Sequence, residues 1–245
     1  VFSVLLPAVV VFSARASQGD TAQFMQVISD MLEKLPESSL TRIISSFETD
    51  QQKVAYMMLN YFLSPFFLMI PLMAASTVSI DSFVGEKERG TFEGLLLTPV
   101  SMRSIFTAKV LAAFLPAIVV SLVSFVLFAI CANVLTWPIF GRISFPHINW
   151  APLVLLVMPA ISVFAILTNV FISARVTTFQ AGYQLGALLA LPLVAIMIGQ
   201  FTGFMLLDTR VLLAVGIILS ILDYVLLRII VRKLDRAWLF ESQVT

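Results

Sequence analysis

Charge is scarce in this sequence. Only 12% of its 245 residues are charged, 60% are hydrophobic, and the mean hydropathy is strongly positive. An ordinary soluble domain carries roughly 25% charged residues, so the composition excludes a water-soluble globular protein. We therefore expect an integral membrane protein.

Cysteine, histidine and basic clusters are also nearly missing. Cys131 is the single cysteine, which excludes an intrachain disulfide and a cysteine-based metal site. The single His147 is more typical of a surface or interface residue than of a ligand. The chain has no run of Lys and Arg that would indicate nucleic acid. We expect neither a metal site nor a nucleic-acid partner.

Long apolar runs are abundant instead. Five can cross a hydrocarbon core of ~30 Å, which takes roughly 20 helical residues. A sixth, at the amino end, is short for a span, so we expect further residues upstream of Val1. The alternative is a signal peptide, because Ala14-Arg15-Ala16 has the form of a cleavage site. The predicted fold class is an all-α, polytopic membrane protein with six transmembrane helices.

The topology follows from the basic residues. A cytoplasmic amino end leaves more Lys and Arg inside than outside, in agreement with the positive-inside rule. The expected single domain, residues 1–245, then consists of the end of the first span (1–16), an outer helical cap (17–52), the second span (53–81), a short cytoplasmic helix (82–100), the third span (101–132), an outer loop (133–150), the fourth, fifth and sixth spans (151–174, 180–207, 211–233) and a cytoplasmic tail (234–245).

Helical periodicity predicts the outer cap. Asp20 is a suitable N-cap, and apolar residues follow at helical spacing until Pro36. A second short helix carries Leu40, Ile43, Ile44 and Phe47. These apolar stripes need a partner, either the outer ends of the spans or the bilayer interface. We favour a packed cap, with a lid over the exit of a pathway as the alternative.

The second outer segment and the spans carry three further patterns. Aromatic residues in the outer segment are typical of the belt at a membrane surface; they are Trp137, Phe140, Phe145 and Trp150. Prolines within spans each remove a backbone hydrogen bond and favour kinks; they are Pro65, Pro71, Pro116, Pro159 and Pro192. Gly182 and Gly186 form a small-xxx-small pair, which predicts close packing of the fifth span.

One long charged insert interrupts the apolar sequence between Asp81 and Ser101. Pro99 limits any helix here to two or three turns. Apolar residues recur at i, i+3 and i+4 as Phe92, Leu95 and Leu96, and acids lie toward the expected N-terminal end. The helix could rest on lipid headgroups, but acids gain nothing at a negatively charged leaflet. A protein partner in the cytosol explains them better.

The stretch GEKERGTFEGLLLTPVS, residues 85–101, resembles the cytoplasmic signature of the type-2 ATP-binding-cassette (ABC) permease family. In that family an Arg-Gly-Thr-aromatic-or-Leu-Glu run leads into Leu-Leu-x-x-Pro. The resemblance implies that this insert is a coupling helix, which docks in a groove of a separate ATPase subunit and carries its motion to the spans. The implied coupling residues are Glu86, Lys87, Glu88, Arg89, Gly90, Thr91, Phe92, Glu93, Leu95 and Leu96.

The chain has no phosphate-binding G-x-x-x-x-G-K-[ST] loop. We therefore expect ATP and Mg in the partner ATPase, and neither a cofactor nor a catalytic residue in this chain. The resemblance also implies two ATPase copies and a second permease chain, as a homodimer or heterodimer. A bacterial or archaeal cell membrane is the expected location.

Ionisable residues within spans are functional candidates. We expect Lys109 and Asp223 to form an interhelical ion pair, with a proton or cation site at Asp223 as the alternative. The resemblance implies a path lined by the second and fifth spans. The candidate path residues are Tyr56, Asn60, Tyr61, Ser64, Gln180, Tyr183 and Gln184. Ordinary hydrogen bonding between helices explains them equally well.

The leading interpretation is the membrane permease subunit of an ABC exporter. The mostly apolar path gives a mild preference for hydrophobic or amphipathic substrates. One alternative is an assembly subunit that recruits an ATPase without transporting anything. Another is an intramembrane enzyme, which would need paired carboxylates, a histidine with a nucleophile, or facing metal ligands within the spans. The sequence offers none of these.

Overall fold

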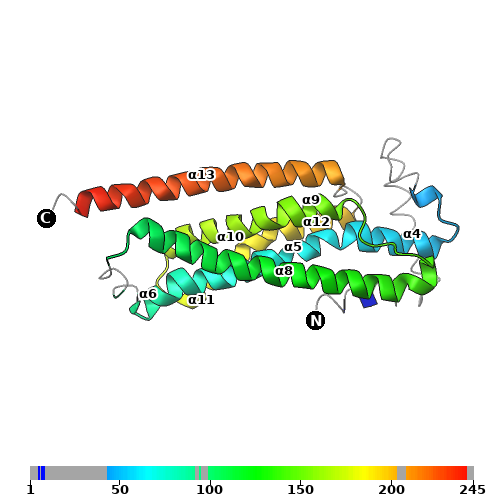
Figure 1. Ribbon diagram of the computed structural model, residues 1–245, viewed down its shortest axis with the longest axis horizontal. Coiled ribbons are helices and arrows are strands. Elements are labelled where there is room, and N and C mark those ends of the chain that lie inside the picture. The colour runs from blue at the N-terminus through cyan, green and yellow to red at the C-terminus, as the bar shows by residue number, and fades with distance from the viewer. Residues whose placement is uncertain are drawn as a thin grey trace. The chain divides into compact units, whose positions relative to one another are not determined.

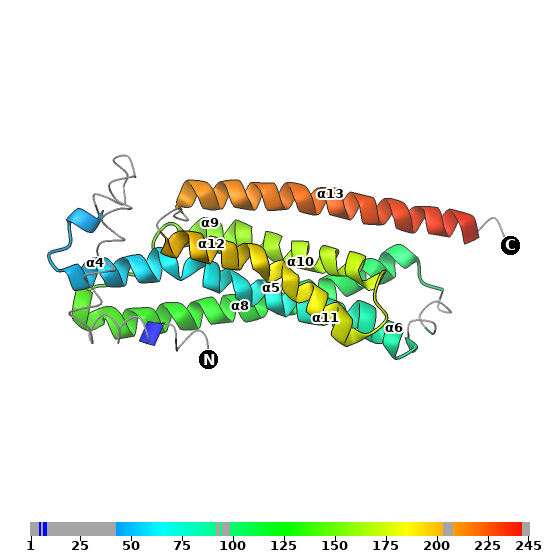
Figure 2. The same ribbon diagram turned by 180° about the vertical axis from the view of Figure 1, so that it is seen from behind.

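The computed structural model describes residues 5, 7–8, 43–91, 94, 99–202 and 208–241, with residues 233–241 as backbone only. All regular elements in these ranges are helical (Figures 1 and 2). Five helical runs are long and apolar enough to cross a membrane: Asp50–Glu88, Met102–Phe140, Trp150–Ser173, Phe179–Phe201 and Thr209–Arg232. The expected first span (1–16) and the first cap helix fall largely outside the described residues, so both stay predictions.

Most of these runs are composite. The described elements are α4 (Asp50–Met57), the π-helical η1 (Met58–Phe62), α5 (Ser64–Ile80), the π-helical η2 (Asp81–Gly85), α6 (Glu86–Glu88), α8 (Met102–Phe140), α9 (Trp150–Pro152), the π-helical η3 (Leu153–Val157), α10 (Met158–Ser173), α11 (Phe179–Ala187), the 3₁₀ turn η4 (Leu188–Ala190), α12 (Leu191–Phe201) and α13 (Thr209–Glu241).

Proline explains where several runs change their winding. Pro65, Pro159 and Pro192 are each the second residue of an α-helix, in α5, α10 and α12. Each helix follows η1, η3 or η4, in the first case after a one-residue turn. A proline cannot donate to the preceding turn, and a local π or 3₁₀ turn accommodates the carbonyl that this leaves free. Pro71 and Pro116 lie inside α5 and α8.

Helix ends differ from the limits that hydropathy predicts. The outer loop expected at 133–150 is helical as far as Phe140, because α8 continues until Gly141. Gly141 has a φ of 60°, a left-handed conformation that glycine adopts without a steric penalty and that commonly terminates a helix. A hydropathy pattern marks the apolar stretch that fits the bilayer core, whereas the helix itself continues until a residue terminates it. The expected limit at residue 132 is therefore corrected.

The chain divides into two compact units, which are described separately. Unit 1 contains residues 1–67, 122–153 and 192–212. Here the described part of the cap packs on α4: Ile44 and Phe47 of the cap are buried in one cluster with Val54, Tyr56 and Met57 of α4. Thr49 caps α4 in a reciprocal capping box with Gln52. The apolar stripe of the second cap helix thus packs on the outer end of a span, which is one of the two partners expected from the sequence.

An aromatic cluster forms the other core of unit 1. Trp150 is 1% exposed, and its ring centroid lies 4.8 Å from that of Phe145, 5.4 Å from that of Phe67 and 5.6 Å from that of Phe128. Phe145 is also 1% exposed, so the belt prediction is wrong for these two residues, whereas Trp137 is 56% exposed. The segment folds back because Asn133 donates to the Phe145 carbonyl and accepts from the Phe145 N–H.

Unit 2 contains residues 68–121, 154–191 and 213–245. Its core includes Phe106, Leu167 and Ile230, from α8, α10 and α13. The close packing predicted at Gly182 and Gly186 is confirmed. A Cβ atom on Gly186 would lie 2.7 Å from Ile80 Cδ1 and 3.1 Å from Asn169 Oδ1, so α11 approaches both α5 and α10 at this point.

Candidate functional site

The charged signature begins as the last turn of a spanning helix. Asp81–Gly85 and Glu86–Glu88 continue directly from α5, and the run ends where Gly90 adopts a φ of 70°. Glu86 and Glu88 were expected at the N-terminal end of a separate helix, but they lie at the C-terminal end of this one. The left-handed glycine is the physical reason, because it terminates the helix after Arg89. Phe92, Glu93, Leu95 and Leu96 lie outside the described residues.

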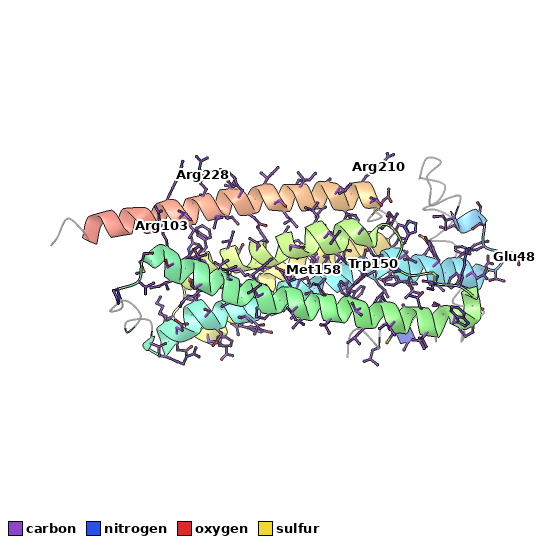
Figure 3. The ribbon with its side chains drawn as sticks, in the orientation of Figure 1. Glu48, Arg103, Trp150, Met158, Arg210 and Arg228 are labelled. Atoms are coloured by element: carbon purple, nitrogen blue, oxygen red, sulfur yellow. The ribbon has the colours of Figure 1, made fainter. Side chains whose placement is uncertain are left out.

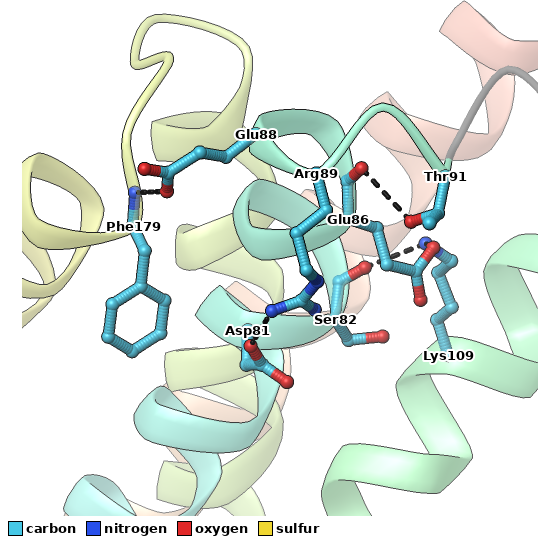
Figure 4. Close-up of polar contacts among 8 residues, drawn as sticks. All are labelled: Asp81, Ser82, Glu86, Glu88, Arg89, Thr91, Lys109 and Phe179. Carbon is cyan, nitrogen blue, oxygen red and sulfur yellow. Dashed lines mark hydrogen bonds and ion pairs between the residues drawn. The ribbon is translucent and has the colours of Figure 1, made fainter.

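Glu86 forms an ion pair with a neighbouring helix. Its Oε2 lies 2.5 Å from Nζ of Lys109 in α8, and the same ammonium donates to the Ser82 carbonyl at 2.7 Å (Figure 4). The Lys109 ammonium also lies 5.3 Å from the centroid of the Phe83 ring. Lys109 is only 7% exposed, so its charge needs these partners.

The pairing of Lys109 with Asp223 predicted from the sequence is therefore wrong. Lys109 pairs with Glu86 because the π-helical turn η2 precedes Glu86 and changes the face on which the following residues lie. Asp223 in α13 is 8% exposed, and its Oδ1 atom has no hydrogen-bond partner among the described residues.

Glu88 and Lys87 fasten the same turn to a third helix. The Glu88 carboxylate accepts the backbone N–H of Phe179 at 2.6 Å, and Lys87 Nζ donates to the Val176 carbonyl at 3.2 Å. Phe179 is the first residue of α11, which Thr178 caps. A carboxylate is stabilised at a helix N-terminus by free N–H groups and by the helix dipole. Figure 4 shows Glu88 reaching across to Phe179.

Arg89 and Thr91 complete the network. Arg89 Nη1 lies 3.1 Å from Asp81 Oδ1, with each side chain 55% exposed, and Thr91 Oγ1 donates to the Glu86 carbonyl at 3.2 Å. An exposed pair contributes little stability. We call the residues Glu86, Lys87, Glu88, Lys109 and Phe179 the inner clamp. The inner clamp joins the end of the α5 run to α8 and to the start of α11.

A comparison with known families decides what the clamp belongs to. The sequence model described as ABC-2 family transporter protein matches residues 5–227. The chain belongs to the ABC-2 family. The searches of curated proteins and of solved structures gave no significant match. In this ABC-2 protein the signature residues 85–101 lie within the matched range, and several apolar helices accompany them, as a transporter permease requires.

The predicted path residues of the second span are packed inside unit 1 of this ABC-2 protein. Tyr56, Asn60, Tyr61 and Ser64 are each at most 5% exposed. Asn60 donates to the Tyr56 carbonyl and accepts the His147 N–H, while Ser64 donates to the Tyr61 carbonyl. The Tyr61 carbonyl also accepts from Gln200. The hydrogen bonds with His147 and Gln200 connect the second span to its surroundings within unit 1, and the path role of the four residues stays a prediction.

The predicted path residues of the fifth span are placed differently. Gln180, Tyr183 and Gln184 are exposed. Tyr183 lines a small groove of about 100 Å³ in unit 2, together with Ser76 and Thr77 of α5. These two hydroxyl residues were not among the candidates, although the small polar run AASTVS in an apolar span was the signal that could have indicated them. The polar residues of the second span that line this groove are thus Ser76 and Thr77, and not Tyr56, Asn60, Tyr61 or Ser64.

Proposed function

We propose that this chain is the membrane permease subunit of an ABC exporter, driven by a separate ATP-hydrolysing subunit. The inner clamp carries the proposal. A segment that only tethered a partner would need no bonds to the rest of the permease. This one is tied to α8 through Glu86 and to α11 through Glu88.

The clamp suggests how motion would pass. ATP and Mg bind in the partner subunit, and the residues after Gly90 contact that subunit. A rigid-body push on them reaches the α5 run through its continuous backbone. It reaches α8 through the ion pair with Lys109, and α11 through the Glu88 carboxylate. Interfaces of this kind transmit small displacements because packed helices move as rigid bodies.

A second permease chain completes the path in this proposal, and two ATPase copies drive it from a bacterial or archaeal cell membrane. The small groove at Tyr183 is mainly apolar, with Leu72, Met73 and Ala187 beside Ser76 and Thr77. This lining favours a hydrophobic or amphipathic substrate over a strongly charged one.

Affinity purification in mild detergent, followed by mass spectrometry of the proteins that co-purify, tests the assembly. We expect an ATPase with a phosphate-binding loop, and we expect Glu93→Lys or Arg89→Glu to lose it. Asp81→Asn is the matched control, because it removes the ion-pair partner of Arg89 but leaves the charges of Arg89 and Glu93 unchanged. A well-folded chain that recovers no ATPase would overturn the proposal. Attachment of the ATPase without substrate-stimulated hydrolysis would favour an assembly subunit instead.

A further inference from the structure

A second site lies within unit 2, away from the small groove at Tyr183. Side chains from α10 and the turn after it, from the α11–η4 run and from α13 line a groove of about 520 Å³. This volume is within the roughly 300–1,000 Å³ typical of ligand pockets. The residues that line it are Thr168, Phe171, Ile172, Arg175, Leu185, Leu188 and Leu226. We call it the α10–α13 groove.

The groove is apolar along its length and cationic at one end. Thr168 and Phe171 lie one turn apart on α10, and Arg175 lies in the turn that follows this helix. All three line the groove. Phe171 and Leu226 also pack on the Phe106, Leu167 and Ile230 core, which forms a firm back wall.

Arg175 lies at the same end of the helices as the inner clamp. Its chain neighbour Val176 accepts a hydrogen bond from Lys87, and the topology expected from the positive-inside rule puts this end in the cytoplasm. Arg175 is exposed. A guanidinium binds phosphate oxygens with two parallel hydrogen bonds, and basic pockets between transmembrane helices on the cytoplasmic side suit anionic headgroups.

We propose that the α10–α13 groove binds one anionic phospholipid of the inner leaflet. The phosphate contacts Arg175, and an acyl chain lies along Phe171, Leu185 and Leu188. A free phosphate would leave the apolar wall unused, and a peptide would bring backbone polar groups that this wall cannot satisfy. The site does not depend on the ATPase partner. Occupancy would brace the turn at residues 174–178, in which the Val176 carbonyl accepts from Lys87, and which leads into Phe179, the partner of Glu88.

Native mass spectrometry of the purified full chain in detergent, titrated with dioleoyl phosphatidylglycerol, tests this site. We expect Arg175→Gln to weaken phosphatidylglycerol binding about fivefold, the contribution of a single cation near a membrane surface. Arg175→Lys should retain most of the binding. Arg228→Gln is the matched control, because this variant also removes one positive charge. The exposed Arg228 side chain projects outward from α13 (Figure 3), and Arg228 is not among the residues that line the groove.

Two further arms distinguish the source of the phosphate chemistry. Leu188→Trp fills the apolar part and should reduce binding even with Arg175 intact, whereas inorganic phosphate should not compete with the lipid. Equal binding of phosphatidylcholine, competition by inorganic phosphate, or wild-type binding by Arg175→Gln would each overturn the proposal. A melting temperature for every variant confirms that it is folded.

Discussion

Two ion pairs near the signature differ in burial and therefore in what they contribute. In the pair of Lys109 with Glu86 the two side chains are 8% and 25% exposed, whereas the side chains of Arg89 and Asp81 are each 55% exposed. Removing one partner of a buried pair leaves an uncompensated charge. We predict that Glu86→Gln lowers the free energy of unfolding by about 3 kcal/mol and that Arg89→Gln lowers it by less than about 1 kcal/mol.

Thermal melting of the detergent-solubilised chain measures both effects. The exchanged double variant Glu86→Lys with Lys109→Glu should recover part of the loss, because it restores opposite charges at the same positions. Equal destabilisation by Glu86→Gln and Arg89→Gln would contradict the difference in burial on which this prediction depends.

His147, in the outer segment between α8 and α9, gives a pH dependence. Burial lowers the pKa of His147 below its usual value, and the contacts with Asn149 and the charge of Asp208 offset only part of this. Below about pH 6.5 the unfolded chain takes up a proton that the folded chain resists. The free energy of unfolding that depends on a neutral His147 is therefore fully present above about pH 6.5. It is lost as the pH falls through the pKa of His147 in the folded chain.

We predict that the melting temperature falls between pH 7.5 and pH 5.5 more steeply in the native chain than in His147→Gln. The histidine ring lies beside those of Tyr56 and Tyr61, at centroid distances of 5.9 and 6.3 Å, so glutamine keeps a polar side chain at this position without the titration. Identical slopes for the two proteins would mean that His147 does not carry the dependence.

At the scale of elements, two glycines should respond in opposite directions. A side chain at Gly186 meets Ile80 and Asn169, whereas a Cβ atom at Gly199 in α12 meets nothing within 4 Å. We predict that Gly186→Val destabilises the fold by about 1–3 kcal/mol through overpacking. Gly199→Ala should stabilise it by roughly 0.5–1 kcal/mol, because alanine favours the helix. Chemical unfolding in mixed micelles measures both, and stabilisation by Gly186→Val would refute the close packing of α11.

The elements also show which features the sequence could predict. Five spans follow from apolar length, and the close approach at Gly182 and Gly186 follows from residue size. The pairing of Glu86 with Lys109 could not be predicted, because it depends on the π-helical turn η2. A 3.6-residue period assigns faces only while the winding is constant. The folding of Trp150 into a core depends on hydrogen bonds of Asn133, which no hydropathy pattern contains.

For the whole molecule, the helices differ in how far one chain buries them. In the most apolar 18-residue stretch of each helix, 61% of the residues are buried in Asp50–Glu88 and in Trp150–Ser173. The buried share is only 17% in Met102–Phe140 and in Phe179–Phe201, and 11% in Thr209–Arg232. The apolar surface of the second span is thus largely covered by the rest of the chain, whereas most of that of the fifth span is exposed. If the second permease chain meets the fifth span, the contact lies on the exposed side of α11 and α12.

Cysteine cross-linking in native membranes tests this contact, because Cys131 is the single cysteine and Cys131→Ser supplies the background. We predict that Tyr183→Cys, at a side chain 40% exposed, gives a cross-linked dimer with a short bismaleimide. Tyr56→Cys, at a position 5% exposed, should give none. A chain that is dimeric by light scattering and does not cross-link at residue 183 would move the interface to α8 or α13, whose apolar faces are also largely exposed.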